Sequence, residues 1–252
     1  MIYFVSDIHL GAGTHEQAQR TEAAFCRWLD MVATDAEAIY LLGDIFDFWF
    51  EYRRVVPQGF TRTLGRLAEL SARGVHVVLF TGNHDMWCYD YLTRECGIEI
   101  VRKPEVRDVN GRKLHLAHGD NMNIKGQPML RLMNRFFRST VARRIFSCLV
   151  HPDLALKFGK WWSGKSRKSH GGERITPQNL GFLVEYAREH YLKHGDTQGY
   201  IFGHMHYPYM LVEQGLRVLF LSDWSSSVAT YATMNDDKEL ELKTFTIDET
   251  VS

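Results

Sequence analysis

Two histidines, His204 and His206, stand two residues apart in the sequence Gly203-His204-Met205-His206, directly after the apolar run Tyr200-Ile201-Phe202. Side chains at this spacing point to the same face if extended geometry continues through Met205, and two imidazoles on one face can bind a metal ion. An isolated pair of this kind is more often two hydrogen-bonded surface histidines. The pair therefore needs further ligands before it predicts a metal site.

Four other short segments carry side chains that would complete such a site. They are Ser6-Asp7-Ile8-His9, Gly43-Asp44-Ile45-Phe46-Asp47, Gly82-Asn83-His84-Asp85 and His118-Gly119-Asp120. Each has an ordinary explanation when taken singly: Asp44 could cap a loop or helix, Asn83 could be a left-handed turn residue, and His118 could be a satisfied core histidine. Chance seldom places five such segments at five strand ends. Strand carboxyl ends are also where open α/β sheets have their ligand crevices.

The apolar pattern predicts the elements that position these segments. β-rich runs predict strands at residues 2–5, 39–42, 75–80, 113–117, 199–202, 208–213, 217–222 and 239–246. Helical spacing predicts helices at 16–33 and 59–73, and a third from Thr176-Pro177 to about His194. Asn110-Gly111 predicts a tight hairpin turn. The alternation of strands and helices in the first half is typical of βαβ units on a largely parallel sheet.

The composition is that of a water-soluble globular protein, with 252 residues, 45% of them hydrophobic and 24% charged. The four cysteines form no CxxC pair, and the short apolar start lacks a basic region and meets Asp7 too early for a signal peptide. We therefore expect a cytoplasmic location. No apolar run approaches the roughly 18 residues that predict a membrane span, so any membrane contact is expected to be peripheral.

Positive charge is concentrated in one segment of the chain. The net charge is zero, which argues against a globally basic nucleic-acid binder. Residues 125–170 nevertheless contain eleven lysines and arginines and a single acid, Asp153, which leaves 19 basic and 29 acidic residues elsewhere. Within this segment, residues 127–162 predict two or three short helices that are both apolar and basic. Composition alone would favour an ordinary helical cap with solvated charges.

The ordered motifs DxH, GDxxD, GNHD, HGD and GHxH, over residues 7–206, resemble those of the calcineurin-like metallophosphoesterases. This resemblance implies an α/β fold with a sandwich of two mixed β-sheets flanked by helices. We expect one domain, 1–252, with a basic helical lid inserted at 124–170. The segment 42–47, the basic insertion after His118-Gly119-Asp120 and the sequence Leu221-Ser222-Asp223-Trp224 are similar to the UDP-2,3-diacylglucosamine diphosphatases of lipid A synthesis. Classical members of that group carry Arg where this chain has His84.

The resemblance implies a dinuclear metal site. One divalent ion would be held by Asp7, His9, Asp44 and His206, and the other by Asp44, Asn83, His118 and His204, with Asp44 as the bridge. The mixed nitrogen and oxygen ligands suit Mn²⁺, Fe or Zn²⁺ better than Ca²⁺, and we expect Mn²⁺ first.

The resemblance also implies roles for residues beside the metals. His84 would lie over the pocket as a catalytic residue, stabilising charge on phosphate or protonating the leaving group. Asp85 would orient His84 or a metal ligand, and Asp47 and Asp120 could do the same, although capping of backbone amides is an equal alternative. Substrate contacts are expected from Asn83, His84, Lys165, Ser166 and Lys168, although the last three could also belong to a solvated loop.

The expected function is hydrolysis of the diphosphate of UDP-2,3-diacylglucosamine to UMP and 2,3-diacylglucosamine 1-phosphate, in lipid A biosynthesis. The basic lid would accept acyl chains and rest on an anionic surface, so the enzyme would be peripherally associated with the inner membrane. One alternative is a phosphodiesterase or nuclease acting on nucleotides or DNA. The aromatic density of the insertion favours lipid, and no nucleic-acid partner is expected. The other alternative is a metal-free scaffold, which the complete set of competent ligands argues against.

Overall fold

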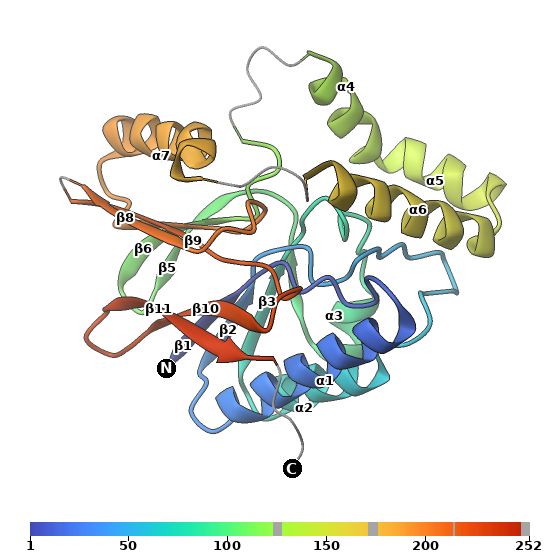
Figure 1. The fold of residues 1–252 in the computed structure, drawn as a ribbon, viewed down its shortest axis with the longest axis horizontal. Helices are drawn as coiled ribbons and strands as arrows, with labels where there is room; N and C mark the ends of the chain where they lie inside the picture. The colour runs from blue at the N-terminus through green and yellow to red at the C-terminus, as the bar shows by residue number, and fades with distance from the viewer. Residues whose placement is uncertain (123–127, 171–175, 214, 248–252) are drawn as a thin grey trace.

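The structure is a computed structural model that describes residues 1–122, 128–170, 176–213 and 215–247 (Figure 1). Its helices lie on both sides of a pair of β-sheets, and a further group of helices extends from one end. The helical elements are α1 (His15–Val32), α2 (Thr61–Ala72), α3 (Tyr91–Cys96), α4 (Pro128–Phe137), α5 (Thr140–Leu149), α6 (Pro152–His170), the 3₁₀ helix η1 (Pro177–Leu180) and α7 (Gly181–His194).

The strands form two mixed sheets. They are β1 (Ile2–Val5), β2 (Ala38–Leu41), β3 (His76–Phe80), β4 (Glu99–Val101), β5 (Glu105–Val109), β6 (Arg112–Ala117), β7 (Gly199–Phe202), β8 (Tyr209–Glu213), β9 (Leu216–Phe220), β10 (Val228–Met234) and β11 (Leu240–Thr246). The first sheet has the order β11-β10-β1-β2-β3-β4 and the second has the order β5-β6-β7-β9-β8. Strands β1 to β4 are parallel, and so are β6, β7 and β9, whereas β10, β11, β5 and β8 pair antiparallel. The fold class implied by the resemblance is confirmed, and the expectation of a largely parallel sheet holds for β1 to β4 of the first sheet and for the three central strands of the second.

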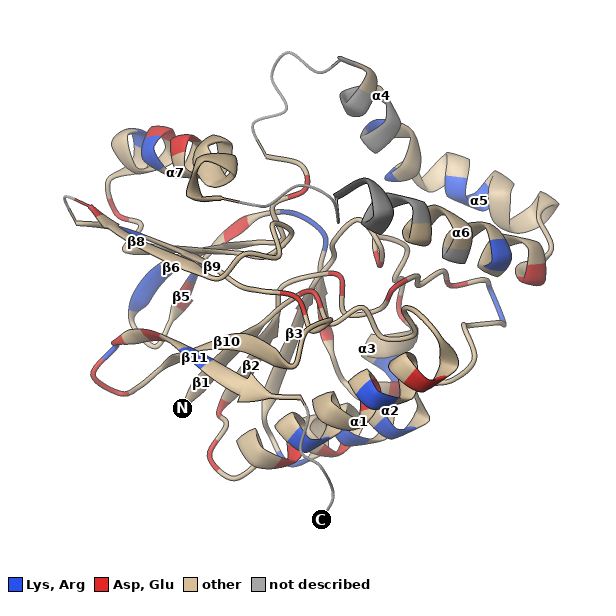
Figure 2. Cartoon of the chain, in the orientation of Figure 1, with Lys and Arg blue, Asp and Glu red and all other residues tan. Residues whose placement is uncertain are grey.

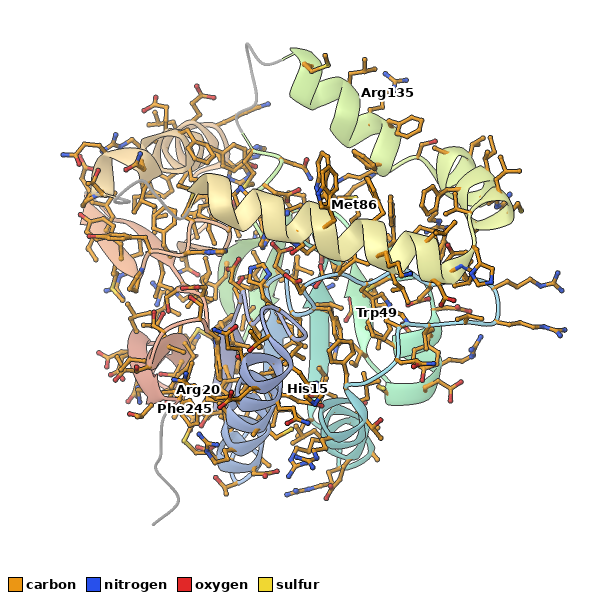
Figure 3. All side chains as sticks on the ribbon, turned by 45° about the vertical axis from the view of Figure 1, so that its right-hand side comes forward. His15, Arg20, Trp49, Met86, Arg135 and Phe245 are labelled. Carbon is orange, nitrogen blue, oxygen red and sulfur yellow. The ribbon has the colours of Figure 1, made fainter. Side chains whose placement is uncertain are left out.

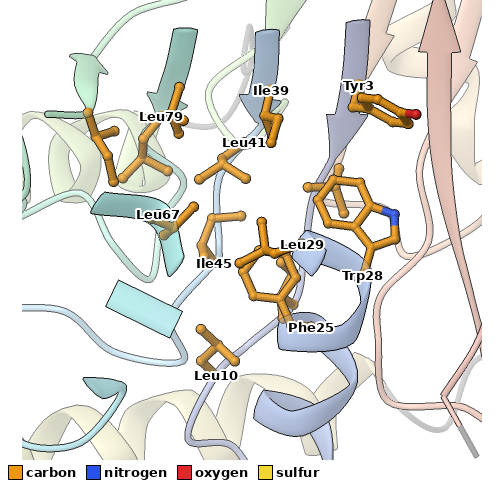
Figure 4. Packing of buried hydrophobic residues seen from close by; sticks show 14 of the residues in the cluster. Tyr3, Leu10, Phe25, Trp28, Leu29, Ile39, Leu41, Ile45, Leu67 and Leu79 are labelled. Carbon is orange, nitrogen blue, oxygen red and sulfur yellow. The ribbon is translucent and has the colours of Figure 1, made fainter. Parts of the chain in front are cut away.

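The layers follow from strands that are apolar on both faces. In β1, Tyr3 and Val5 pack toward α1 and α2, whereas Ile2 and Phe4 pack toward the second sheet. This alternation is the two-residue period of a strand. Figure 4 shows the first of these cores, where Trp28 of α1 lies among strand side chains. A third core fills the space between the second sheet and α7, so the order of layers is helix, sheet, sheet, helix.

Most elements lie where the sequence predicts them. Asn110 and Gly111 have φ angles of 50° and 73° and join β5 to β6 as a tight hairpin. The predicted third helix begins as η1, with Pro177 in its first turn. The prediction missed β4, α3 and β10, and it implied β5 only through the hairpin turn, without giving a strand range. The first two span only three and six residues, and β10 reads VATYATM, where small residues weaken the apolar signal although most of the strand is buried.

The helical insertion, α4 to α6, confirms the prediction of short helices over residues 127–162 and forms a group beside the sheets (Figure 1). Hydrogen bonds tie it to the body: for example, the indole N–H of Trp87 donates to the carbonyl of Phe137 at 2.6 Å, and the hydroxyl of Tyr52 donates to the carbonyl of Val150 at 3.0 Å. Figure 2 marks lysine and arginine positions on α5 and α6 in blue. Among the described residues, no helix is both long enough and apolar enough to span a bilayer.

Candidate metal centre

The five predicted segments come together where strands of both sheets end. Asp7 follows β1, Asp44 follows β2 and Asn83 follows β3 in the first sheet, whereas His118 follows β6 and His204 follows β7 in the second. Because β1 to β3 are parallel, and β6 and β7 are parallel, each group of segments leaves its sheet at one edge. Strand direction therefore brings residues from distant parts of the sequence into one site.

The backbone at this site is held in an unusual conformation. Five of the residues expected to bind metal have left-handed φ angles, namely Asp7 (55°), His9 (51°), Asp44 (53°), His204 (67°) and His206 (51°). Such angles cost a residue with a side chain of the order of 1–3 kcal/mol and persist only where the surroundings impose them. Concentration of this strain on the predicted ligands is independent support for a functional site.

The same angles correct the first expectation from the sequence. Strand β7 ends at Phe202, so extended geometry does not continue through Met205, and His204 and His206 are not a same-facing pair on a strand. They belong to different groups of converging side chains. His206 lies with Asp7 and His9, and His204 lies with Asp44 and His118; within each group the potential ligand atoms are within 4.8 Å of one another. This division matches the two ligand sets that the family resemblance implies.

Glycines beside the ligands are required by close approach. A Cβ added at Gly43 would lie 2.6 Å from Nδ1 of His118, and the φ angle of Gly43 is 89°. At Gly203, a Cβ would lie 2.5 Å from Oδ2 of Asp7 and would also overlap the hydroxyl of Ser6. A larger residue at either position would displace a predicted ligand.

Each carboxylate has one oxygen held by the protein and the other directed into the site. Oδ2 of Asp7 accepts hydrogen bonds from the hydroxyl of Ser6 at 2.6 Å and from the amide of His204 at 2.9 Å. Oδ1 of Asp44 accepts the amide of His84 at 2.8 Å. The remaining oxygens lie close to imidazoles: Asp7 Oδ1 is 3.1 Å from Nε2 of His206, and Asp44 Oδ2 is 3.2 Å from Nε2 of His118. The protein thus orients both carboxylates before any ligand arrives.

The imidazole of His118 is oriented by the protein in the same way. Nδ1 of His118 donates to the carbonyl of Leu42 at 2.9 Å, so that Nε2 is the nitrogen that faces Asp44. Nε2 of His9 and Nε2 of His206 are 3.3 Å apart. Hydrogen bonding of the outer nitrogen to a backbone carbonyl is the usual way in which a protein fixes the tautomer of a metal-binding histidine.

Several buried polar atoms of the site have no hydrogen-bond partner among the described residues. They are Asp7 Oδ1, His9 Nδ1, Asn83 Oδ1 and His118 Nε2. The short contacts from Asp7 Oδ1 and His118 Nε2 therefore lack the alignment of a hydrogen bond. Unpaired buried acceptors are costly, and converging carboxylate, amide and imidazole acceptors are the ligands of divalent transition metals. The residues present fit a metal centre, with Asp44 between the two groups because it lies within ligand distance of His9 and of His118.

The electrostatics of the site distinguish its members. Burial raises the pKa of Asp7, but the neighbouring His206 outweighs this and lowers it to about 2. Burial lowers the pKa of His206, but Asp7 raises it to about 9. Burial, reinforced by neighbouring histidines, lowers the pKa values of His9 and His204 to about 3 and about 4. His9 and His204 are thus neutral and ready to bind metal, whereas His206 must first release a proton.

His84 lies beside the metal ligands and its ring is fixed. Its Nδ1 donates to the carbonyl of Asp47 at 2.7 Å, so that Nε2 faces the site, 3.9 Å from Oδ2 of Asp44. Its ring centroid is 4.9 Å from that of His9. From this position a protonated His84 can donate to a phosphate oxygen or a leaving oxygen. His84 also lies within ligand distance of His9 and Asp44, a proximity that the sequence did not predict.

The three neighbouring acids contact backbone or the insertion. Both oxygens of Asp85 accept hydrogen bonds from backbone amides, those of Gly82 at 2.7 Å and of Ile45 at 2.8 Å. Asp85 therefore caps backbone amides, which was one of the two roles expected for it. Burial and the charge of Asp44 raise the pKa of Asp85 to about 6. Asp47 accepts a hydrogen bond from the hydroxyl of Ser163 in α6 and lies 3.7 Å from Nδ1 of His9.

Asp120 accepts a hydrogen bond from Arg138 at 2.8 Å, at the junction of α4 and α5. Lys165, Ser166 and Lys168 fall within α6, not in a loop, and their side chains lie outside the described residues.

Two cavities meet at this centre. The larger, of about 610 Å³, is lined by His9, Asp44, Asn83, His84, His204 and His206 and extends past α1. The smaller, of about 50 Å³, lies between the body and the insertion and is lined by Phe48, Asn83, His84, Met86, Trp87, Phe137, Phe158, Gly159, Trp162 and Ser163. Asn83 and His84 line both cavities. A ligand that spans them would cross the metal centre.

Sequence reasoning missed several residues of the site. Ser6 orients Asp7, and Asp223 lies 4.0 Å from Nδ1 of His206. Both were visible only as neighbours of stronger motifs. Gln17, Arg20 and Thr21 line the larger cavity from α1. They have no local motif, because their part in the site depends on how α1 packs beside the strand ends.

The family model for calcineurin-like phosphoesterases matches residues 1–208, and the chain belongs to that family. It is therefore a metallophosphoesterase. A curated relative from Porphyromonas gingivalis, named UDP-2,3-diacylglucosamine hydrolase, is 40% identical over 240 residues, which cover 88% of this chain and 90% of the relative.

A second relative with that name, from Stutzerimonas stutzeri, is 33% identical over 78% of this chain and 81% of its own length. A solved structure of a novel archaeal phosphodiesterase is 12% identical, covers 97% of this chain and 99% of its own, and gives a TM-score of 0.47.

Proposed function

We propose that this protein hydrolyses the diphosphate of UDP-2,3-diacylglucosamine, giving UMP and 2,3-diacylglucosamine 1-phosphate. The observation that carries the proposal is the 40% identity, over nearly the full length of both chains, to a relative named for this substrate. The structure adds a physical rationale, because a cavity lined by both polar and apolar side chains and a second, mainly aromatic cavity meet at the metal centre. The substrate likewise has a polar nucleotide at one end of its diphosphate and an acylated sugar at the other.

The proposed cofactor is a pair of divalent ions, with Mn²⁺ first and Fe or Zn²⁺ as alternatives. Asp7, His9, Asp44 and His206 would hold one ion, and Asp44, Asn83, His118 and His204 the other. Such ions supply Lewis-acid stabilisation of the phosphoryl oxygens and activate water for attack on phosphorus. His84, fixed by the carbonyl of Asp47, would donate a proton to the leaving phosphate oxygen. Asp85 would act by positioning, since it binds the amides of the two loops that carry His84 and Asp44.

The helical insertion is proposed to be the lid that binds the acyl chains. The smaller cavity is lined mainly by aromatic and apolar side chains of the body and of α4 and α6, and it ends at Asn83 and His84. Apolar surface of this kind stabilises alkyl chains by about 25 cal/mol per Å² of buried area. Lys165, Ser166 and Lys168 lie on the same helix as Trp162 and remain predicted contacts of the diphosphate.

We also propose that the outer face of the insertion rests on an anionic membrane surface. Large apolar side chains on this face are exposed, including Leu132 (64%), Ile145 (55%) and Leu149 (79%). The same helices, α4 and α5, carry the exposed Arg135 and Arg144, as expected for an interfacial helix. Leu149→Asp should lower sedimentation with phosphatidylglycerol vesicles several-fold, whereas Leu192→Asp, at a leucine equally exposed on α7, should not. Equal binding by both variants would contradict membrane docking through the insertion.

Product analysis tests the proposed reaction. Protein loaded with Mn²⁺ is incubated separately with UDP-2,3-diacylglucosamine, with UDP-glucosamine lacking acyl chains, and with single-stranded DNA. We expect release of UMP from the acylated substrate, much less from the deacylated compound, and none from DNA, with loss of activity on chelation and recovery with Mn²⁺. Comparable cleavage of DNA or of a simple aryl phosphodiester, without UMP release, would favour the phosphodiesterase or nuclease alternative.

A further inference from the structure

The larger cavity has an end that the metal centre does not explain. From His9 and His206 the cavity extends to Gln17, Arg20 and Thr21 of α1. On the other side it is bounded by Ser225 and Ser226, in the segment between β9 and β10. Its volume of about 610 Å³ lies within the roughly 300–1,000 Å³ typical of small-molecule sites. We call this end the α1 end; its polar lining is these five residues, and Ala12, Gly13, Trp224 and Ile247 also line the cavity.

The side chains of the α1 end share one face of a well-formed helix. Positions 17, 20 and 21 are spaced i, i+3 and i+4, so they lie together on the surface of α1. The first turn is fixed by a capping box in which Thr14 accepts the amide of Gln17 at 3.2 Å and the side chain of Gln17 accepts the amide of Thr14 at 2.8 Å. Figure 3 labels Arg20 on this helix.

The opposite wall is also firmly held. The amide of Trp224 donates to the carbonyl of Asp7 at 3.1 Å, which ties the segment after β9 to the metal centre. The Trp224 ring is buried and packs 5.5 Å from that of Phe25 in α1. The amide of Ile247 donates to the carbonyl of Ser227 at 2.8 Å. Both walls of the α1 end are therefore anchored, which is the preorganisation that a specific polar subsite needs.

The two cavities differ in chemistry although they share Asn83 and His84. Aromatic side chains such as Trp87, Phe137 and Trp162 line the cavity under the insertion. The α1 end offers a guanidinium, a carboxamide and three hydroxyls, which together donate and accept several hydrogen bonds. A nucleoside has the matching groups: base carbonyls and an N–H, and ribose hydroxyls.

We propose that the α1 end is the nucleoside subsite of this enzyme, in which Gln17, Arg20 and Thr21 bind the uridine half of the substrate. This inference rests on the proposed function, because that function supplies a nucleotide on one side of the scissile diphosphate. It assigns specificity for the nucleotide to α1 and leaves the acylated sugar to the insertion. Arg20 is the main donor, since guanidinium groups bind carbonyl and phosphate oxygens in a fixed geometry.

Calorimetric binding to the Mn²⁺-loaded protein tests the subsite without turnover. UMP and phenyl phosphate share the phosphate group but only UMP carries a nucleoside, so wild type should bind UMP at least tenfold more tightly. Arg20→Ala should lower the affinity for UMP about tenfold and the affinity for phenyl phosphate by less than twofold. Arg20→Lys should recover part of the lost UMP affinity. Thr21→Val, which conserves the shape of the side chain, should lower the affinity for UMP about threefold. Arg62→Ala removes an exposed arginine from α2, outside the cavity, and should change neither affinity.

Equal weakening of UMP and phenyl phosphate in Arg20→Ala, or no preference for UMP in wild type, would overturn the subsite. The binding assay and the turnover assay fail independently. If UMP preference depends on Arg20 but UDP-2,3-diacylglucosamine is not hydrolysed, the proposed substrate is wrong and the nucleoside subsite stands. If that substrate is hydrolysed but UMP affinity does not respond to Arg20→Ala or Thr21→Val, the subsite is wrong and the proposed function stands.

Discussion

In the metal centre Asp7, Asp44 and His118 expose 0%, 1% and 3% of their surface, whereas Met129 and Leu149 of the helical insertion expose 71% and 79%. The first region hides charged groups and the second displays apolar ones. Both arrangements cost stability in an isolated chain, because buried charge and exposed apolar surface are each unfavourable. The proposed function explains both, because buried carboxylates and imidazoles would bind cations and exposed apolar side chains would contact lipid. The comparison teaches that departures from ordinary burial mark the places where a binding role is to be tested.

Removal of the proposed bridging carboxylate should have the largest effect. Asp44→Asn is nearly isosteric but loses the negative charge shared by two groups of ligands. We expect metal content, measured by mass spectrometry, to fall and turnover to drop by more than about a hundredfold, since mutation of even the outer partners of metal ligands costs about 10–100-fold. Circular dichroism should show a retained fold. Full turnover in Asp44→Asn would contradict the bridging role.

The difference between buried and exposed polar groups can also be tested through the pH dependence of stability, at the buried His115. The ring of His115 shares a hydrogen bond of 3.1 Å with the hydroxyl of Tyr186. Burial, and to a smaller extent the neighbouring His190, lowers the pKa of His115 to about 4. As pH falls from about 6.5 toward 4, the unfolded chain takes up this proton before the folded one does. The contribution of neutral His115 to the free energy of unfolding is therefore complete above about pH 6.5 and is lost as the pH falls toward 4. It amounts to about 3 kcal/mol.

Urea unfolding at pH 4.5 and pH 7 measures this effect. His115→Phe should show a smaller loss of unfolding free energy between the two pH values than wild type does. His151→Phe is the matched control, because His151 begins the turn into α6 and exposes 69% of its side chain; it should behave as wild type. The same pH dependence in wild type and His115→Phe would show that other groups dominate acid sensitivity.

Two adjacent tryptophans of α6 provide the finest comparison. Trp162 lines the smaller cavity, whereas its neighbour Trp161 does not and exposes 58% of its surface. Trp162→Ala should lower kcat/KM for UDP-2,3-diacylglucosamine about tenfold, because part of a large apolar contact is lost. The effect on a small aryl phosphodiester should be under twofold. Trp161→Ala should leave the ratio of the two activities unchanged, and equal effects of the two substitutions would remove the insertion from acyl-chain recognition.

The convergence of the predicted ligands could be foreseen from sequence because these residues directly follow strand ends. Asp7, Asp44 and His118 each lie within three residues of a strand that the apolar pattern reveals. The conformation of the ligands could not be predicted, since the left-handed angles at His204 and His206 are imposed by tertiary contacts, including the bond from the His204 amide to Asp7. Local strand geometry therefore gave the wrong orientation for this pair.

Residues that act across the fold gave no sequence signal. Arg20 and Trp162 belong to helices whose periodicity predicts only packing, and their cavities exist because helices meet strand ends far away in the chain. Strand β10 was missed for a related reason: its pairing with β1 and β11, not its own small residues, makes it a strand.

Anomalous diffraction from crystals loaded with Mn²⁺ tests the central claim most directly. Two peaks are expected, about 3.5–4 Å apart, with a carboxylate oxygen of Asp44 between them. One peak should lie beside Asp7, His9 and His206, and the other beside Asn83, His118 and His204. A single peak, or two peaks that Asp44 does not join, would contradict the account of this site.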